Sequence, residues 1–417
     1  MPIREIAVSN FKSFREMEIS PDRFNIIIGS NASGKSNFIQ IFKFIRDIAK
    51  YGLQNAISLQ GGVEYFRNTL IGPVEDFSLR ISYVLETLQE DIVAVRDGLP
   101  VYFRPVEITY QFGLKFADSG KSYSIAHEDL LVTGNYLVYD EQGTRDRGEG
   151  SISLSRRNHS LHIGVHPPDS LRLLEHEILP LLNQLKDLPP SWLMINMPPA
   201  IPGIPPLEWI FRGMKVFDFD PRLLKSAVPI MGKNDLEKDG RNLAIVIRNI
   251  LEDPEKKASF SRLLNDMLPF VDEVEVEKFM DMSLFLKFRE TYGKESYFPA
   301  SMISDGTINL CALIIALYFE ERPVTVIEEP ERNIHPYLIS RLVEMLRDAS
   351  RTKQVIVTTH NPEMVRHARI EDILLITRDK DGFSRLERPA NKKEVRTFLA
   401  HEIGIEDLFI QNLLGME

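Results

Sequence analysis

A glycine-rich segment near the N-terminus has the spacing of a phosphate-binding loop. It matches the pattern G-x-x-x-x-G-K-[ST] and reads Gly29, Ser30, Asn31, Ala32, Ser33, Gly34, Lys35 and Ser36. Such a loop turns its backbone N–H groups around an anion, while its lysine reaches the β- and γ-phosphates and its hydroxyl group ligates Mg²⁺. The sequence therefore predicts that this segment binds ATP and that Ser36 is a ligand of Mg²⁺.

The elements on both sides of this loop agree with that prediction. The apolar run Phe24–Ile28 is typical of a buried strand, and the apolar residues between Lys35 and Lys50 recur with helical spacing. A glycine-rich turn formed by chance would need neither element. We therefore favour the phosphate loop over a structural turn.

A second apolar run ends in two neighbouring carboxylates. Residues 325–327 are apolar or β-branched and are followed by Glu328, Glu329 and Pro330. In open α/β sheets, ligands bind beyond the carboxyl ends of the strands. We expect Glu328 to hold Mg²⁺ through a bound water and Glu329 to orient or deprotonate the attacking water. The alternative, a pair of exposed acids at a strand end, is weakened by the phosphate loop.

Two further segments could contact the terminal phosphate. His360 follows the predicted strand Gln354–Thr358 and could hydrogen-bond the γ-phosphate, although a helix-capping loop with an incidental histidine would give the same pattern. Ser304, Asp305 and Gly306 precede a predicted helix, where Ser304 could act as the N-cap and the helix start could bind an anion. A cap alone would also explain that motif.

The order of these motifs resembles the ABC-type ATPase heads of the SMC and RecF group. Within this group, the chain looks most similar to stand-alone prokaryotic ATPases related to the overcoming-lysogenization-defect (OLD) proteins. Shared features include Val8–Phe14, the pair Asp239-Gly240 followed by Asn242-Leu243, and the stretch Glu402–Gly415. The resemblance implies an α/β P-loop fold, with a mixed sheet flanked by helices and a β-rich N-terminal lobe.

The same resemblance implies how the motifs act. Ser304 and Gly306 would contact the γ-phosphate held by a second copy of the chain, Glu331–His335 would lie along the seam of that dimer, and His360 would be the switch histidine. The first acid of the pair is usually Asp in this group, but here it is Glu328. The glutamine loop of the group has no clear counterpart.

Gln60 and Gln111 are candidates for that loop by residue type only. For each of them, an ordinary polar residue is the favoured interpretation.

The middle of the chain lacks these motifs. We expect an ATPase head formed by residues 1–144 and 282–417, with residues 145–281 inserted as a middle lobe. Several short β-like runs lie between Phe77 and Leu161, a helix is predicted at Leu171–Leu188, and Pro189–Pro206 is rich in proline and predicted to be a connector. The segment Asn242–Leu268 is predicted to form two helices, and residues 274–288 a hairpin.

Composition limits the class of protein. The 417 residues are 43% hydrophobic and 26% charged, with a formal net charge of -10 and one cysteine, Cys311. These values indicate a cytoplasmic protein without a disulfide framework or a signal segment, and no apolar run approaches the roughly 20 residues that span a bilayer. The net charge argues against a surface coated by nucleic acid. The arginines Arg145, Arg147, Arg156 and Arg157 are interpreted as a solvated loop and strand edge, with a local basic patch as the alternative.

The motifs together favour an ATPase that forms a homodimer, or a higher oligomer, around two ATP molecules. Its work would be done on DNA or on a separate effector protein such as a nuclease, in antiphage defence or DNA maintenance. We expect no nuclease domain within this sequence. The alternative is a slow ATP-gated clamp that sequesters a partner protein until a trigger arrives. The motor of a membrane transporter is disfavoured.

Overall fold

In the computed structural model, the chain forms two compact units. The structure describes residues 2–85, 91–96, 99–140, 143–157, 160–171, 192–197, 205–279, 282–293, 296–400, 404–411 and 413–414. Unit 1 comprises Met1–Asp22, Ala32–Met214 and Ile376–Glu387, and unit 2 comprises Arg23–Asn31, Lys215–Leu375 and Arg388–Glu417. Each unit is therefore assembled from segments that are distant in sequence.

Unit 1 is built on an eight-stranded antiparallel sheet with the order β2-β1-β4-β6-β7-β8-β9, and β5 pairs with β6. The strands are β1 (Ile3–Phe11), β2 (Phe14–Ile19), β4 (Phe77–Val84), β5 (Asp91–Arg96), β6 (Leu99–Phe116), β7 (Tyr123–Asp140), β8 (Gly143–Arg157) and β9 (Ser160–His166). Buried and less buried positions alternate along β6, as expected when one face of a sheet packs on a core.

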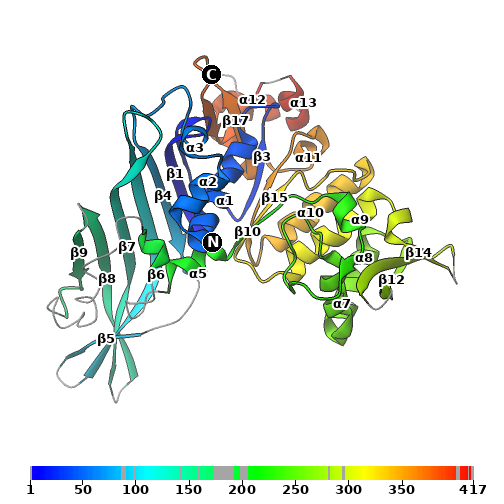
Figure 1. Ribbon diagram of the computed structural model, residues 1–417, viewed down its shortest axis with the longest axis horizontal. Coiled ribbons are helices and arrows are strands. Elements are labelled where there is room, and N and C mark those ends of the chain that lie inside the picture. The colour runs from blue at the N-terminus through cyan, green and yellow to red at the C-terminus, as the bar shows by residue number, and fades with distance from the viewer. Residues whose placement is uncertain are drawn as a thin grey trace. The chain divides into compact units, whose positions relative to one another are not determined.

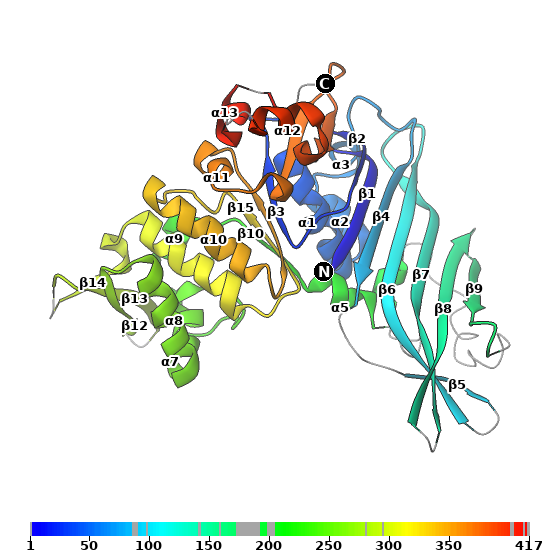
Figure 2. The same ribbon diagram turned by 180° about the vertical axis from the view of Figure 1, so that it is seen from behind.

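Helices cover one part of this sheet (Figures 1 and 2). They are α1 (Lys35–Tyr51), α2 (Leu53–Leu59), α3 (Val63–Phe66) and α5 (Leu207–Arg212), with a short 3₁₀ turn, η2 (Met194–Asn196). Phe44 of α1 packs against Phe77 of β4 and Phe112 of β6, with ring centroids 5.9 and 6.5 Å apart. Burial of these rings fixes α1 on the sheet, because aromatic side chains contribute most of the buried apolar area in such contacts.

Unit 2 contains the parallel strands that follow the predicted pattern. The six-stranded sheet has the order β10-β15-β16-β3-β17-β18, in which β15, β16, β3 and β17 run parallel. The strands are β3 (Phe24–Ile28), β10 (Met214–Phe217), β15 (Val324–Glu328), β16 (Gln354–Thr358), β17 (Ile373–Arg378) and β18 (Ser384–Glu387), of which β18 belongs to unit 1. All residues of β3 and β16 are buried, which is typical of parallel strands covered on both faces.

Helices and a small antiparallel sheet complete unit 2. The helices are α6 (Pro221–Leu224), α7 (Leu243–Glu252), α8 (Pro254–Met267), α9 (Asp305–Ile314), α10 (Ile339–Ala349), α11 (Pro362–Arg366), α12 (Lys393–Ala400) and α13 (Ile405–Ile410), and a π-helical turn, η4 (Ile315–Phe319), follows α9. The small sheet contains β11 (Val228–Pro229), β12 (Val271–Phe279), β13 (Ser283–Glu290) and β14 (Tyr297–Pro299). One continuous hydrophobic core joins these elements.

The predicted α/β class and the elements around the motifs are confirmed. The strand at Phe24–Ile28, the helix after Lys35 and the hairpin of β12 and β13 are present. The break between α7 and α8 lies at Asp253, whose side chain accepts hydrogen bonds from the first backbone N–H groups of α8. The helix predicted at Leu171–Leu188 lies, except for Leu171, outside the described residues, as does most of Pro189–Pro206.

The predicted boundary after Thr144 falls inside β8, which pairs with β7 along its length. The strands of this region are also longer than the short runs that the sequence suggested, and β6 and β7 have 18 residues each. Gly113 does not end β6: a Cβ atom there would lie 2.3 Å from the His127 ring, so the glycine leaves room for this side chain of β7.

Candidate nucleotide site

The phosphate loop connects β3 to α1, as predicted. β3 ends at Ile28, α1 begins at Lys35, and the Gly34 carbonyl accepts the hydrogen bond from the Phe38 N–H at 2.9 Å. Gly34 has φ +123°, and a Cβ atom there would lie 2.3 Å from the Ser384 Oγ. Both the backbone conformation and the crowding therefore require glycine at this position.

Two features of the loop fit an anionic ligand such as a nucleotide phosphate. Ala32 has φ +63°, a left-handed conformation that costs a residue with a Cβ atom on the order of 1 kcal/mol and that concentrates at functional sites. The first turn of α1 carries no acidic residue, and Gly34 offers no side-chain cap. The positive end of this helix is therefore not matched by a carboxylate of its own first turn.

Three strands end in register at one edge of the unit 2 sheet. Glu328 of β15 pairs with Thr358 of β16, and Thr358 pairs with Ile27 of β3. The Glu329 N–H donates to the Thr358 carbonyl at 3.0 Å, and the Thr359 N–H donates to the Ile27 carbonyl at 2.9 Å. The acidic pair, the segment with the histidine and the start of the phosphate loop therefore leave the sheet at the same edge.

The Glu329 carboxylate is held by two basic side chains. One oxygen lies 2.8 Å from His360 Nδ1, and the other accepts a hydrogen bond from Arg332 Nη2 at 3.2 Å. Glu329 also has φ +44°, which is unusual for a residue with a side chain. Partial burial raises the pKa of Glu329, but hydrogen bonds from Arg332 and His360 and their charges outweigh this effect, so the net pKa is lowered. The group is thereby kept ionised.

The sequence placed Arg332 only within the segment Glu331–His335 and gave it no role at Glu329. Besides Glu329, its guanidinium contacts the Asp218 carboxylate at 3.2 Å and the Phe219 carbonyl at 3.3 Å. Asp218 directly follows β10, the edge strand of the same sheet. The sequence signals for Arg332 are its place three residues after Glu329 and its place in the segment Glu331–His335, and none marks Asp218.

Glu331 is a buried acid beside this pair. It accepts a hydrogen bond from Thr359 Oγ1 at 2.5 Å, and the Thr359 Oγ1 accepts one from the Asn361 N–H at 2.9 Å. Burial raises the pKa of Glu331, and the hydrogen bond from Thr359 offsets part of that rise. Glu331 thus joins the loop after β15 to the loop after β16. This contact fixes the position of the neighbouring Glu329 and His360.

Ser304 caps helix α9, as predicted. Its Oγ accepts the Thr307 N–H at 3.1 Å, and both Ser304 and Asp305 are exposed. Asp305 forms an ion pair with Lys225. Gly306 is buried, and a Cβ atom there would lie 2.4 Å from the Asn333 carbonyl oxygen. The helix start therefore packs closely on the loop that follows the acidic pair.

The two candidates for the glutamine loop make ordinary structural contacts. Gln60 is buried, with its side-chain amide donating to Gln40 at 3.2 Å and its carbonyl accepting from Lys12 Nζ at 2.8 Å. Gln111 lies in β6 and donates to Asp129 of β7 at 2.9 Å. These hydrogen bonds account for the positions of both glutamine side chains without a bound nucleotide. The glutamine loop stays unassigned.

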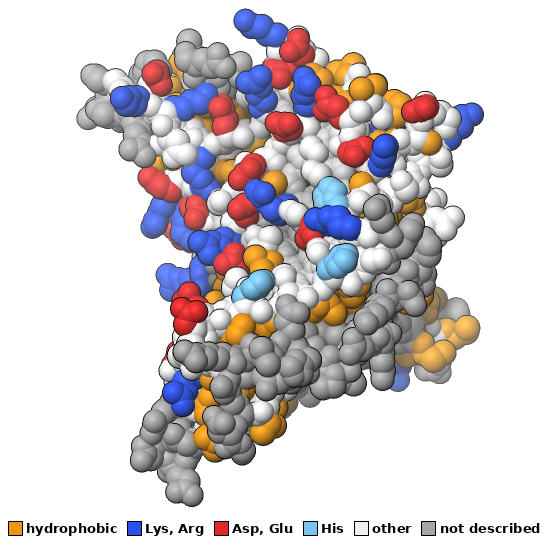
Figure 3. Space-filling view, turned by 90° about the vertical axis from the view of Figure 1, so that its left-hand side faces the viewer, with side chains coloured by type: hydrophobic (Ala, Val, Ile, Leu, Met, Phe, Trp, Pro, Cys, Tyr) orange, Lys and Arg blue, Asp and Glu red, His pale blue; other side chains and the backbone are white. Residues whose placement is uncertain are grey.

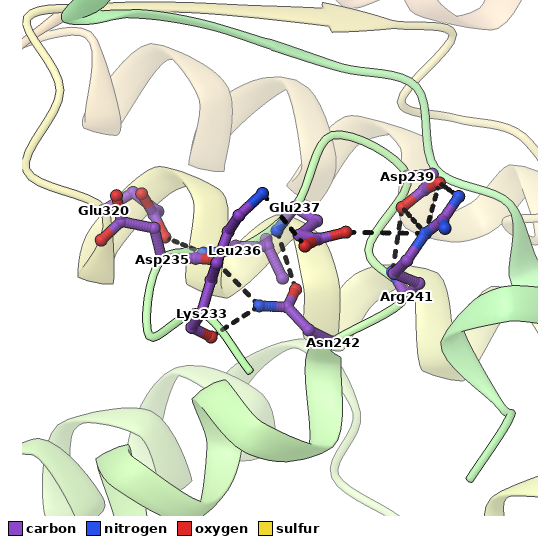
Figure 4. A network of polar contacts seen from close by, with 8 residues as sticks. All are labelled: Lys233, Asp235, Leu236, Glu237, Asp239, Arg241, Asn242 and Glu320. Carbon is purple, nitrogen blue, oxygen red and sulfur yellow. Dashed lines mark hydrogen bonds and ion pairs between the residues drawn. The ribbon is translucent and has the colours of Figure 1, made fainter. Parts of the chain in front are cut away.

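The Asp239-Gly240 and Asn242-Leu243 motif organises a loop in unit 2 (Figure 4). The Asn242 side chain accepts the Glu237 N–H at 2.8 Å and donates to the carbonyls of Lys233 and Asp235, each at 2.9 Å. Asp239 holds Arg241 with a hydrogen bond of 2.9 Å. The buried amide of Asn242 satisfies backbone groups that the loop cannot pair internally.

The arginine cluster in unit 1 does not form a single exposed patch. Arg156 is buried, donates to the Trp192 carbonyl and lies 3.7 Å from Glu128, while Arg157 pairs with Asp129 at 2.9 Å. The side chain of Arg145 lies outside the described part of the structure. Over the described part of the face in Figure 3, Lys and Arg side chains are interspersed with Asp and Glu.

The described residues also bear on membrane-spanning helices and on metal clusters. None of the helices there is long and apolar enough to cross a membrane. No group of three or more His, Cys, Asp and Glu side chains in that part of the chain could hold a metal ion by itself. Mg²⁺ in phosphate-transfer sites is commonly held by one or two protein groups together with phosphates and water, so the predicted ligands Ser36 and Glu328 have the appropriate chemistry.

Comparison with known proteins identifies the family. A family model described as "AAA domain, putative AbiEii toxin, Type IV TA system" matches residues 24–366, more than half of the chain. A Helicobacter pylori (strain ATCC 700392 / 26695) protein named ATP/GTP phosphatase is 21% identical over 390 residues, covering 91% of this chain and 89% of that protein.

Solved structures of similar fold are heads of SMC proteins. An SMC head bound to the C-terminal winged-helix domain of ScpA has a TM-score of 0.50 at 16% identity, covering 93% of this chain and 97% of that chain. An SMC head from Pyrococcus furiosus, bound to the C-terminal domain of ScpA, has a TM-score of 0.49 at 15% identity, covering 96% and 99%. The chain therefore belongs to this AAA-domain family, and it is an ATPase with the fold of an SMC-type head.

Proposed function

We propose that two copies of the chain close around two ATP molecules and that each nucleotide is shared between them. The observation that carries the proposal is the common edge at which β15, β16 and β3 end. This edge presents Glu329 and His360 where the phosphate loop begins. Ser304 and Asp305 lie exposed at the start of another helix, where they are accessible to a second copy.

The residues have separate roles in this proposal. Lys35 and the backbone of Gly29–Ser36 bind the phosphates, while Ser36 and Glu328 hold Mg²⁺. The metal neutralises charge on the phosphates when bound. Glu329 orients or deprotonates the attacking water, and His360 positions Glu329 and the γ-phosphate. Ser304 and Gly306 complete the site of the other copy.

The physical reason for a shared site is electrostatic. A phosphate loop surrounds a nucleotide from one side, and a second helix start can bind the γ-phosphate from the other. Because only the dimer offers both, ATP stabilises the dimer by binding it more tightly than the monomer. Dimer formation should therefore depend on the γ-phosphate.

Closure of the dimer is proposed to act on DNA or on an effector protein that acts on DNA. Support comes from the description of the matching family, which refers to a toxin–antitoxin system, and from the SMC head that was solved with the winged-helix domain of ScpA. Defence against phage and DNA maintenance are both compatible with that support. A separate effector would supply any nuclease activity.

The clamp alternative is favoured by one contact. Both oxygens of Glu329 are engaged by basic side chains, so a water molecule must compete with Arg332 and His360 for the carboxylate. A slow turnover would suit a switch that holds a partner protein. Steady-state ATP hydrolysis with and without DNA separates the two functions, because stimulation by DNA supports the first and a slow, unstimulated rate supports the clamp.

Two variants test the assignment of the site. Lys35→Ala should abolish tight ATP binding, measured by titration with a fluorescent ATP analogue. Glu329→Gln should retain ATP and lower the hydrolysis rate about 10²- to 10⁴-fold, because the amide preserves size but removes the base. Glu363→Gln, a partly exposed acid near His360 in the sequence, is the control for a change of charge. If Glu329→Gln hydrolyses ATP at the rate of the parent, Glu329 is not the catalytic base, and Glu328 becomes the first candidate for that role.

A mixing experiment tests the shared site. Ser304→Arg should bind ATP but block closure, because the added side chain occupies the space for the partner's phosphate. When mixed with Lys35→Ala, it can form a dimer with one intact and one doubly damaged site. Light scattering should then detect ATP-dependent association of the mixed pair. If Ser304→Arg alone dimerises with ATP and hydrolyses it normally, the shared-site model is wrong.

A further inference from the structure

A buried serine from the C-terminal part of the chain contacts the phosphate loop. Ser384, the first residue of β18, is 1% exposed, and its hydroxyl contacts the Ser33 carbonyl and the Ser13 Oγ, the latter at 2.7 Å. The Ser384 N–H donates to the Ser13 carbonyl at 2.8 Å. Asn37 in the first turn of α1 donates to the Ser13 Oγ at 2.8 Å. All four residues belong to unit 1.

The direction of these hydrogen bonds follows from counting hydrogens. A serine hydroxyl has one hydrogen to donate, and a carbonyl can only accept. Ser384 must therefore donate to the Ser33 carbonyl, and Ser13 must donate to Ser384. The Asn37 amide then donates to Ser13, so each hydroxyl gives one hydrogen bond and accepts one. The chain of bonds has a single direction and ends on the loop backbone.

The preceding carbonyl of the loop is held by an arginine. Arg378 at the end of β17 donates its Nε–H to the Ala32 carbonyl at 3.0 Å. The turn after Arg378 is closed by Asp379, whose carboxylate accepts the N–H groups of Asp381 and Phe383 at 3.0 and 2.9 Å. The β17–β18 hairpin therefore presents Arg378 and Ser384 to two successive peptide groups of the loop.

Holding these carbonyls also directs the amides of the loop. In a trans peptide the C=O and N–H groups point in opposite directions, and no cis peptide bond occurs in the described residues. A Ser33 carbonyl that faces Ser384 turns the Gly34 N–H away from Ser384. An Ala32 carbonyl that faces Arg378 likewise turns the Ser33 N–H away from Arg378. Backbone N–H groups of such loops are the groups that bind phosphate.

We propose that Ser13, Asn37, Ser384 and Arg378 form a loop clamp that orients the amides of Ser33 and Gly34 for the phosphates of the nucleotide. These are positioning residues, since they act on the loop backbone from behind. The proposal rests on the proposed nucleotide site and adds residues that its motifs do not include. It also gives a physical role to Ser13 in the N-terminal stretch Val8–Phe14.

Ser384→Ala tests the clamp. Loss of the hydroxyl removes the donor to the Ser33 carbonyl, and we expect the dissociation constants of ATP and of inorganic pyrophosphate to rise about five- to tenfold. The matched control is Ser82→Ala, because Ser82 is also a buried serine of unit 1, whose hydroxyl pairs with Thr109 at 2.9 Å. The control should bind both probes as the parent does.

A second measurement does not depend on nucleotide binding. The Phe38 N–H donates to the Gly34 carbonyl, so a loosened loop should speed hydrogen exchange at this amide. We expect about fivefold faster exchange in Ser384→Ala than in Ser82→Ala, both without nucleotide. If Ser384→Ala does not fold, Arg378→Leu replaces it, since this side chain is exposed; a two- to threefold rise in both dissociation constants is then expected.

The outcomes separate the clamp from the proposed function. If Lys35→Ala loses ATP binding while Ser384→Ala and Arg378→Leu bind ATP as the parent does, the loop clamp is wrong. The assignment of the nucleotide site is then unaffected. If the parent itself binds no ATP, the proposed function fails. In that case, an unchanged rate of hydrogen exchange at the Phe38 amide in Ser384→Ala also overturns the loop clamp. Faster exchange there supports the role of the loop clamp in holding the phosphate loop.

Discussion

Gly306 offers a sharp test of how helix α9 packs on the loop that follows the acidic pair. An alanine Cβ at this position would lie 2.4 Å from the Asn333 carbonyl oxygen and 3.3 Å from its carbon. Contacts under 3.0 Å are essentially never seen for Cβ atoms, so the helix start or the loop must move by at least 0.6 Å, the difference between 3.0 and 2.4. Overpacking of this kind costs about 1–3 kcal/mol.

Part of that cost is returned because alanine favours a helix over glycine by about 1 kcal/mol. The free energy of unfolding of Gly306→Ala should therefore fall by only about 0–2 kcal/mol. The displacement has a larger effect on activity, because Asn309 also donates to the Arg332 carbonyl at 3.0 Å and Arg332 holds Glu329. We expect the rate of ATP hydrolysis to fall at least tenfold.

The measurements are denaturant unfolding, steady-state ATP hydrolysis and ATP-dependent light scattering. Gly293→Ala is the matched control, because a Cβ atom there would meet only Phe298 at 3.8 Å, an ordinary contact. If Gly306→Ala hydrolyses ATP and dimerises as well as Gly293→Ala does, the close packing of α9 on Asn333 cannot be present in the working enzyme.

Three further predictions follow from the polar contacts. In Arg332→Gln, loss of the guanidinium should raise the pKa of Glu329, so the acid limb of the hydrolysis profile should move to higher pH; an unmoved limb would assign that limb to another group. Burial raises the pKa of Glu128 to about 7 from 4.5, so this group favours folding most when protonated. Stability should fall by at most about 3 kcal/mol as pH rises through that interval, and Glu128→Gln should remove this dependence, measured by denaturation at pH 5 and pH 8. Asn242→Ala should lower the free energy of unfolding by about 2–4 kcal/mol, because three backbone groups lose their partner; a change below 0.5 kcal/mol in a urea titration would contradict the role drawn for it.

The tertiary structure decided contacts for which the sequence has no local signal. Arg332 reaches Asp218, more than one hundred residues away, and Ser384 reaches Ser33 from the opposite end of the chain. Ser384 belongs to no recognised motif, and the segment Glu331–His335 that contains Arg332 gives no local signal of the contact with Asp218. Their partners are set by which strands become neighbours in the sheets, and strand order depends on packing of the whole chain.

The sequence by itself determined the class of fold and the chemistry of the motifs. Gly34 needs a conformation that glycine alone adopts readily, and runs such as Phe24–Ile28 must be buried wherever they lie, so local pattern is sufficient for them. The strand lengths around Gly113 and the burial of Arg156 were not determined in this way. Both depend on neighbours across the sheet, because an arginine can leave water only when distant groups such as the Trp192 carbonyl and Glu128 satisfy its charge and its donors.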